Sequence, residues 1–287
     1  MFKRTTWTGS VLAAGLAFTA QAQQSINLGQ ADYSTWTLFG AAQSSAPVVA
    51  NGYLYRDIQL TIASTGDSAG AAFAPSPITL NFNQPFDFHF PFFIRPGGIR
   101  GDGLTFTLTD VPGVGSGGSD LGYGGSSSNS VAFAVDTFHF DGEPVSPSLQ
   151  VLKAGSVTPV AFTETGLNDG IRDQNLQWIG QVQYTPSGLG DERGTLTGSI
   201  SRPDFGAFSV SAVIDGTVVG TRLTDAQTSE YLGNSVYFGF TAANGLADDG
   251  HVVTSAVPVP EPESWAMLVV GLGLILGRLR QRAARSG

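Results

Sequence analysis

Between residues 23 and 257 the sequence breaks into short apolar or alternating runs, each followed by glycine, proline, asparagine or aspartate. Residues 104–108 (LTFTL) and 195–200 alternate apolar with polar or small side chains, which is typical of a strand with one buried face. No part of this region keeps the 3.6-residue period of an amphipathic helix. The strands that we expect are residues 58–62, 78–82, 86–90, 104–108, 131–140, 178–184, 194–200, 208–214 and 235–240. The region is therefore predicted to be one all-β domain, a sandwich or a barrel.

Composition removes several classes of function. The chain has no cysteine, so disulfides, thiolate zinc sites and cysteine nucleophiles are excluded, and its 3 histidines are few for a multi-histidine metal centre. Residues 23–260 hold 8 basic and 21 acidic side chains, a net charge of −13. Such a surface repels a phosphate backbone, so we expect no nucleic acid among the partners. It suits carbohydrate, divalent cations or simple solubility.

The first 22 residues have the three parts of a secretory signal peptide. Lys3 and Arg4 form a short basic region, residues 11–20 are mostly apolar but too few to span a bilayer, and Ala20-Gln21-Ala22 is a small-x-small cleavage site. We predict that residues 1–22 are a signal peptide removed after Ala22, and that the protein is exported. The alternative is a buried first helix.

The C-terminal end, residues 258–287, combines a proline-rich segment, an apolar segment and a basic end. Residues 264–277 are almost wholly apolar and, with their flanks, are long enough for one membrane helix, and four arginines follow at 278, 280, 282 and 285. The combination resembles the PEP-CTERM sorting signal of Gram-negative bacteria. The resemblance implies that an exosortase cuts near Pro260, Glu261 and Pro262 after a transient stay in the inner membrane. The alternative is an ordinary C-terminal membrane anchor.

Two patterns bear on catalysis. Residues 66–70 (GDSAG) fit the G-x-S-x-G nucleophile pattern, but that elbow needs a helix after the serine, and residues 71–77 are unsuited to one. A glycosidase needs two carboxylates a few ångström apart, which on one strand would place acidic residues two positions apart. Ala134 and Phe138 occupy those positions around Asp136. We therefore expect no enzymatic activity.

Several segments, taken in order, resemble the bacterial branch of the legume-type (L-type) lectin family. They are residues 101–106 (GDGLTF), 121–123 (LGY), 129–138 (NSVAFAVDTF), 178–200 and 236–245 (VYFGFTAANG), and weaker likenesses extend the match over nearly all of residues 25–256. Their order and spacing carry the resemblance, since each piece alone is degenerate. The resemblance implies a concanavalin-like jelly-roll sandwich of antiparallel sheets, with a flat back sheet, a curved front sheet and binding loops at the rim of the front sheet.

The same resemblance implies a sugar site. The family's sugar-binding aspartate corresponds to Asp102, which would follow Gly101 through a cis peptide, and a carboxylate there can accept two sugar hydroxyls. A backbone N–H of the glycine- and serine-rich surface loop, residues 116–130, also contacts sugar in the family. An aromatic ring is a natural platform for a sugar face. The candidate sugar-binding residues are Asp102, Gly118, Ser119, Phe140 and Leu246.

The metal site that the resemblance implies is altered. Asp136 and the carbonyl of Phe138 match ligands of the family, but the family's glutamate is Ala134 here, its asparagine falls on Phe140, and its histidine has no counterpart in residues 148–151. These departures argue against a transition metal. Calcium stays open, because hard cations bind clustered oxygens. Its candidate ligands are Asp136, Phe138, Asp141 and Glu143, and the alternative is that residues 141–143 are only a charged turn.

The expected organisation is a signal peptide (1–22), an L-type lectin-like domain (23–257) and a sorting tail (258–287). The function that follows is non-enzymatic binding of a glycan or exopolysaccharide at the cell surface, at the outer membrane or in the extracellular matrix of a Gram-negative bacterium. The alternative is a structural matrix protein that keeps the lectin fold but has lost sugar and metal binding. Retained Asp102 favours the first function, and the altered metal positions favour the second.

Overall fold

The structure is a computed structural model that describes residues 24–259 and the single residue 275. Residues 24–259 form eighteen strands and five short 3-10 helices, with no α-helix among them. No helix within the described residues is long and apolar enough to cross a membrane. The signal peptide with cleavage after Ala22, the Pro260-Glu261-Pro262 motif and the C-terminal apolar helix lie outside the described residues and stay predictions. The 3-10 helices are η1 (Leu28–Gln30), η2 (Tyr33–Thr35), η3 (Gly118–Asp120), η4 (Asn168–Ile171) and η5 (Gly216–Val218).

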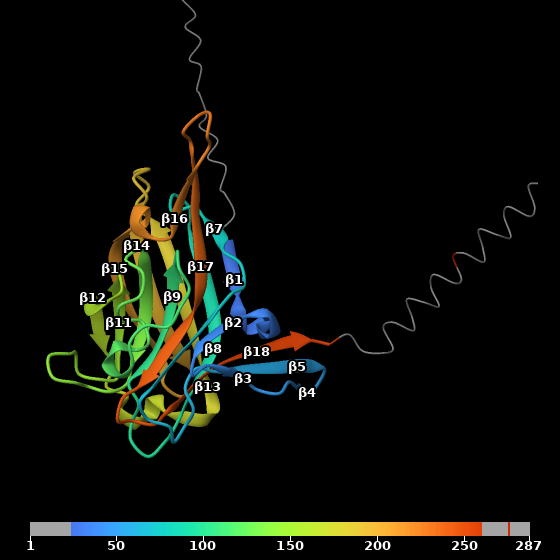
Figure 1. Cartoon of the computed structure of the whole chain (residues 1–287), viewed down its shortest axis with the longest axis vertical. Helices are drawn as coiled ribbons and strands as arrows, with labels where there is room; N and C mark the ends of the chain where they lie inside the picture. The colour runs from blue at the N-terminus through green and yellow to red at the C-terminus, as the bar shows by residue number, and fades with distance from the viewer. Residues whose placement is uncertain (1–23, 260–274, 276–287) are drawn as a thin grey trace, which may run out of the picture.

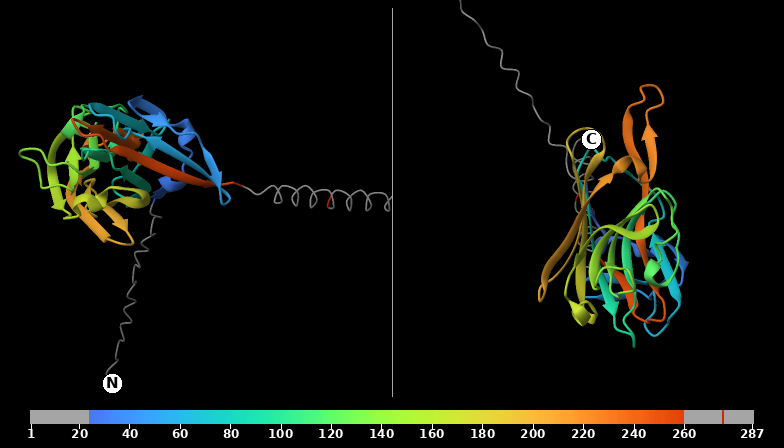
Figure 2. Two further views of the ribbon diagram at one scale, coloured as in Figure 1. Left: turned by 90° about the horizontal axis from the view of Figure 1, so that it is seen from below. Right: turned by 90° about the vertical axis from the view of Figure 1, so that its left-hand side faces the viewer.

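Two sheets pack against each other (Figures 1 and 2). The first, which we call the back sheet, has the order β15-β14-β13-β8-β18-β5-β3, with β1 beside β8 and β4 beside β5. All its pairings are antiparallel except that of β1 with β8. Its strands are β1 (Gln24–Asn27), β3 (Gln43–Ser44), β4 (Val48–Ala50), β5 (Tyr53–Gln59), β8 (Phe86–Arg95), β13 (Asp173–Pro186), β14 (Arg193–Arg202), β15 (Gly206–Asp215) and β18 (Gly250–Pro258).

The second sheet, which we call the front sheet, has the order β12-β11-β10-β9-β17-β6-β2, with β7 and β16 beside β17. All its pairings are antiparallel. Its strands are β2 (Thr37–Gly40), β6 (Ser68–Phe73), β7 (Ile78–Leu80), β9 (Gly103–Thr109), β10 (Ser130–Asp136), β11 (Ser148–Lys153), β12 (Ser156–Glu164), β16 (Thr221–Thr224) and β17 (Tyr231–Asn244). The expected all-β sandwich of antiparallel sheets is therefore confirmed, with more strands than the sequence indicated.

Strand β8 shows how a two-residue period builds the core. Phe86, Phe88, Phe90 and Phe92 are each at most 1% exposed, and they alternate along the strand, so they point between the sheets. Phe106 of the front sheet stacks on Phe90 with ring centroids 5.3 Å apart. Burying one such side chain stabilises a fold by about 1.5–3 kcal/mol, so this row is a large part of what holds the two sheets together.

Residues 104–108 do form a strand, β9, but the expectation that only one of its faces is buried was wrong. Thr105 and Thr107 are at most 1% exposed, and every residue of β9 is buried. The loop between β9 and β10 covers this second face. Its residues Leu121 and Tyr123 pack in a small second core, together with Ala132, Ala134 and Leu152 of the neighbouring strands. Strand β14, by contrast, alternates between buried and more exposed residues as its sequence indicates.

The strand expected over residues 131–140 ends early, at Asp136. Oδ1 of Asp136 accepts a hydrogen bond from the backbone N–H of Phe138 (3.1 Å), which turns the chain out of the sheet. Phe140 therefore lies in the following loop, and 61% of its surface is exposed.

Candidate functional site

The ends of three neighbouring front-sheet strands meet at one rim of the sandwich. Asp102 directly precedes β9, Phe138 follows β10, and Gly245 follows β17. Between them lies a pocket of about 300 Å³ with a mostly apolar wall. Its lining consists of Ile99, Asp102, Gly118, Ser119, Phe138, Phe140, Gly245, Leu246 and Ala247. The structure thus gathers all five candidate sugar-binding residues around one pocket, although their role in binding sugar stays a prediction.

Asp102 is the acidic residue of this pocket. Its side chain lies against the backbone N–H of Gly245, which donates to Oδ2, and Gly245 is the one other described residue that donates to this carboxylate. Only 5% of Asp102 is exposed, and burial raises the pKa of its carboxyl, although the Gly245 hydrogen bond acts in the opposite direction. No other residue of the described chain donates to Oδ1, so this oxygen can accept a ligand hydroxyl.

The backbone around Asp102 is held by residues at the end of β10. Thr137 donates its N–H to the Asp102 carbonyl (2.8 Å) and its hydroxyl to the Gly101 carbonyl (2.5 Å). The cis peptide expected between Gly101 and Asp102 was wrong, since the one cis peptide of the described residues joins Ser146 to Pro147. The chain enters β9 through Gly103 instead. Its φ of +139° is a backbone conformation that residues other than glycine rarely adopt.

A buried ion pair, which the sequence analysis missed, fixes the loop before Asp102. Asp249 is fully buried, and Arg172 binds both of its oxygens, at 2.7 Å and 2.9 Å. The same carboxylate accepts the backbone N–H groups of Gly97 (2.7 Å) and Gly101 (3.0 Å). Asp249 is therefore a positioning residue for Asp102. The available signal was two adjacent acidic residues shortly after the 236–245 segment, but their partner lies 77 positions away.

The rim of the pocket is apolar and accessible. Phe140 and Leu246 are 61% and 90% exposed, and they line the pocket from two different loops. The Phe140 loop is tied by the N–H of Phe140, which donates to the Glu143 carboxylate at 2.8 Å. A carboxylate at the base with an aromatic ring at the rim can bind a molecule that presents hydroxyls on one side and C–H groups on the other.

Asp136, the central candidate metal ligand, has a different environment. It is 4% exposed, and both of its oxygens accept hydrogen bonds from the protein. Oδ1 binds the Phe138 N–H (3.1 Å) and the Ser146 hydroxyl (2.8 Å), and Oδ2 binds the Gln150 amide at 2.6 Å. Burial raises the pKa of Asp136 to about 7, and the nearby Glu143 carboxylate acts in the same direction.

The four candidate calcium ligands do not form a metal-binding group. Among the described residues no set of three or more histidine, aspartate or glutamate side chains is arranged to hold a metal ion. Donor groups already surround Asp136, the Glu143 carboxylate binds the backbone of Phe140, and Asp141 is exposed. The residues present therefore do not fit a calcium ion, because a cation needs oxygen lone pairs where this site directs N–H and O–H groups.

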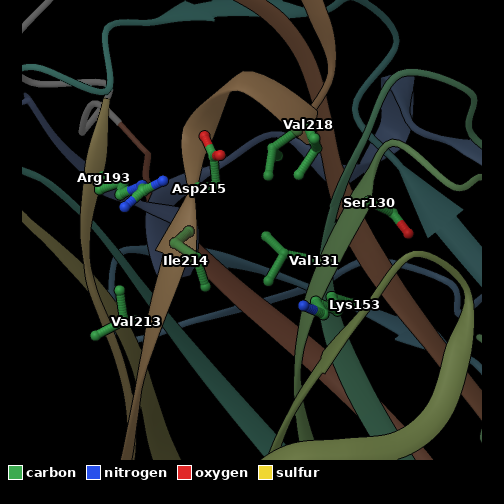
Figure 3. Close-up of a pocket in the computed structure, with 9 residues that line it drawn as sticks. Ser130, Val131, Lys153, Arg193, Val213, Ile214, Asp215 and Val218 are labelled. Atoms are coloured by element: carbon green, nitrogen blue, oxygen red, sulfur yellow. The ribbon is translucent and has the colours of Figure 1, made fainter. Parts of the chain in front are cut away.

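A second hollow, of about 290 Å³, lies at the opposite end of β10 (Figure 3). Apolar side chains from both sheets form its walls, with Lys153 and Arg193 at its edges. It is lined by Ser130, Val131, Lys153, Arg193, Val213, Ile214, Asp215, Val218 and Val219. It contains none of the candidate site residues, and both of its cationic side chains are exposed to solvent. The pocket at Asp102 is therefore the better candidate.

No protein-family model matches the chain, and no curated protein matches it. Solved structures do. The lectin of Bauhinia forficata in complex with GalNAc has a TM-score of 0.56 and 21% identity, over 80% of this chain and 95% of that one. Lectin I-B4 of Griffonia simplicifolia, in a metal-free form, has a TM-score of 0.55 and 21% identity, over 78% and 91%. The basic winged bean lectin with Tn-antigen has a TM-score of 0.55 and 21% identity, over 78% and 93%. At such identity the likeness shows the fold, and the described domain has the fold of the legume lectins.

Proposed function

We propose that the protein is a non-enzymatic lectin that binds a glycan in the pocket at Asp102. The observation that carries the proposal is the pocket itself, where a buried carboxylate that accepts one hydrogen bond from another residue lines the same hollow as the exposed side chains of Phe140 and Leu246. Lectins with the same fold are described in complex with GalNAc and with Tn-antigen, which supports a sugar as the ligand.

The pocket suits one sugar residue better than an anion. Asp102 would repel a negatively charged ligand, and no basic side chain lines the pocket. The carboxylate can accept hydroxyl hydrogens, while the exposed Phe140 ring can pack against a C–H face. Since Asp136 is satisfied by protein donors, we propose that this binding does not require calcium.

A glycan array tests the proposal. The full chain, purified in a detergent without a sugar headgroup, is applied with calcium and with EDTA, in parallel with Asp102→Asn. We expect the same glycans to be bound in both buffers and to be lost in the variant. An array on which the unmodified protein binds nothing, or on which Asp102→Asn binds equally well, would contradict the proposal.

We further propose that the protein is exported and reaches the cell surface, outer membrane or exopolysaccharide matrix of a Gram-negative bacterium. The supporting features are the residues of the two chain ends: the cleavage pattern at Ala22, and the Pro260-Glu261-Pro262 motif with its apolar and arginine-rich continuation. An exosortase is the processing partner that this tail implies. Intact-mass analysis of protein from its native host tests this, because residues beyond about 262 should be missing. Retention of residues 265–280 would count against exosortase cleavage.

The second candidate function is a structural matrix protein on a lectin fold. One observation favours it: Gln150, Ser146 and the Phe138 N–H satisfy Asp136, so a position that matches a ligand in metal-binding lectins is internal to the fold here. The glycan array separates the two functions, because a structural protein would bind no array glycan.

A further inference from the structure

A second group of aromatic and polar side chains lies on the outer face of the back sheet. Ile58 on β5 and Val253 on β18 are directly paired and fully buried, so they face the core. Because side chains alternate along a strand, Tyr53, Tyr55 and Thr254 lie on the opposite, outer face. In Figure 1 β5 and β18 extend together away from the rest of the sandwich, so this face is reached from solvent.

This face is hollowed. One hollow, of about 390 Å³, has β1, η1, β5, β8, β13 and β18 around it. Its lining includes Gln30, Tyr53, Tyr55, Pro91, Gln177 and Thr254. A second hollow, of about 500 Å³, contains Phe93 and Ile179, and Gln177 lines both. The two hollows therefore adjoin on one face of the sheet, which favours an elongated ligand over a compact one.

Two tyrosine rings stand at the edge of the first hollow. Tyr53 and Tyr55 are 42% and 37% exposed, with ring centroids 6.4 Å apart. Neither hydroxyl makes a hydrogen bond with another residue of the described chain. Adjacent exposed rings with free hydroxyls offer both an apolar surface and hydrogen-bonding groups, a combination that is enriched where a protein binds a partly polar molecule.

The polar groups around the rings are unused. Within residues 24–259, the side chains of Gln30, Gln177 and Thr254 make no hydrogen bond to other residues. A glutamine amide offers two donors and an acceptor, and a threonine hydroxyl offers both functions, which matches a ligand rich in hydroxyls. The charged neighbours Asp57 and Arg95 bind each other at 3.1 Å, so the face presents little net charge.

We propose that this outer face of the back sheet is a second glycan-binding surface, for a neutral polysaccharide chain that packs on Tyr53 and Tyr55 and hydrogen-bonds Gln177. It shares no residue with the pocket at Asp102, so it does not rest on the proposed function. Together with a glycan site at Asp102, this surface would let one protein link two carbohydrate chains, as suits a matrix, and this consequence alone rests on the proposed function.

Affinity electrophoresis tests the surface, with the full chain in gels that contain galactomannan, xyloglucan or laminarin. We expect at least one polysaccharide to retard the protein, and the double variant Tyr53→Ala/Tyr55→Ala to weaken that affinity about tenfold or more. The matched control is Phe162→Ala, which removes an aromatic ring that is 53% exposed on β12 of the other sheet. It should leave the retardation unchanged. Tyr53→Phe/Tyr55→Phe keeps the rings and should keep most of the affinity.

Three outcomes would overturn the inference: no retardation by any of the three polysaccharides, equal retardation of the double alanine variant, or loss of all retardation in Asp102→Asn. A fourth is a halved mass of the alanine variant in light scattering, since that would make the face a contact between two copies of the chain. Loss of retardation in Asp102→Asn would instead support the pocket at Asp102, and the other outcomes leave the array experiment undecided, because that experiment depends on Asp102. Both tyrosines are exposed, so melting temperatures of the variants should match the unmodified protein.

Discussion

Asp102 and Asp136 lie at the same end of the front sheet, and their environments differ. Asp136 pairs with Gly103 across β10 and β9, so the two aspartates are neighbours across two adjacent strands. They are buried to the same degree, 5% and 4% exposed. Only Gly245 donates to the Asp102 carboxylate from elsewhere in the described chain, and Asp102 lines a pocket. The Asp136 oxygens bind three protein donors, and Asp136 lines no part of that pocket.

The difference separates two reasons for burying a carboxylate. A buried charge is costly unless hydrogen bonds satisfy it. Three donors of the protein itself bind the Asp136 carboxylate, so we interpret Asp136 as a structural residue. Asp102 accepts a hydrogen bond from one other residue and lines a pocket, so we interpret its carboxylate as a group that binds a ligand. Burial alone does not distinguish them. The number of donors around each carboxylate does.

The largest effect should come from removing the support of Asp102. Asp249→Ala removes both short contacts of the Arg172 guanidinium, which is 13% exposed, and leaves it only the Asp169 carboxylate at 3.4 Å as an acidic partner. It also frees the N–H groups of Gly97 and Gly101. Breaking a buried ion pair costs about 3–5 kcal/mol, and we expect that loss in the free energy of unfolding by denaturant. The control is Asp248→Ala, an adjacent carboxylate that binds only loop N–H groups and should cost much less. Equal losses would show that Asp249 has no special role.

The next effect is a pH dependence that belongs to Asp136. Burial raises the pKa of Asp136 to about 7, so the folded protein holds a proton there that the unfolded chain releases near pH 4. The stability from this group is therefore fully present below about pH 4 and is lost as the pH rises through 7. Asp136→Asn removes this loss. The free energy of unfolding of the variant, relative to that of the unmodified protein, should therefore rise by up to about 4 kcal/mol between pH 4 and pH 8.

A second buried group, His251, also makes stability depend on pH, but its effect cancels between the variant and the unmodified protein. Burial lowers the pKa of His251 to about 4, so its stability contribution is lost as the pH falls below its unfolded pKa, which is opposite to Asp136. His251 is present in both proteins, so its effect cancels when their unfolding free energies are subtracted at each pH. A difference that stays flat from pH 4 to pH 8 would mean that the hydrogen bonds of Asp136 offset its burial completely.

For Asp102 the expected effect is on binding. Asp102→Asn keeps the shape of the side chain but replaces one acceptor oxygen with a donor. Hydrogen bonds to charged groups contribute about 1.5–3 kcal/mol, so affinity for an array-identified glycan should fall roughly ten- to a hundredfold in calorimetry. The free energy of unfolding should change little, in contrast to Asp249→Ala. Unchanged affinity in the folded variant would move the sugar site away from this pocket.

Local pattern was enough to predict nine of the eighteen strands, some with shifted ends, and the family resemblance named five residues that line the Asp102 pocket. The two-residue period of β8 and β14 is visible in the sequence because apolar side chains point to the core and more polar ones to solvent. The pocket residues could be named because a resemblance in order and spacing places them at one rim. The second face of β9 could not be predicted, because nothing in a glycine- and serine-rich loop shows that Leu121 and Tyr123 will cover Thr105 and Thr107.

The side chains that bind Asp136 and Asp249 come from distant parts of the chain, and local sequence pattern does not show which parts will meet. Gln150 reaches Asp136 because β11 pairs with β10 so that Gln150 lies opposite Ala134. Arg172 reaches Asp249 from 77 positions away. A one-residue shift of β11 against β10 would turn Gln150 to the other face, and the residue types along the chain do not specify which register forms. Arg172 and Asp249 lie in loops, so their meeting depends on the path of the whole chain.

The smallest expected effect is the response to metals, and it tests the Asp136 half of the comparison directly. A cation that binds the folded state raises its stability by RT ln(1 + [L]/Kd), about 2.7 kcal/mol at a hundredfold excess over Kd. Gln150, Ser146 and the Phe138 N–H already occupy the Asp136 oxygens, so calcium or manganese would have to displace three hydrogen bonds to bind there. We therefore expect thermal melts in EDTA, calcium and manganese to agree within about 1 °C, because no such stabilisation is gained.

The control for this measurement is Asp136→Asn, whose melting temperature should be equally insensitive to the metals. A rise in calcium or manganese that Asp136→Asn abolishes would show that the carboxylate exchanges its protein donors for a cation, and the contrast with Asp102 would then describe only the metal-free protein.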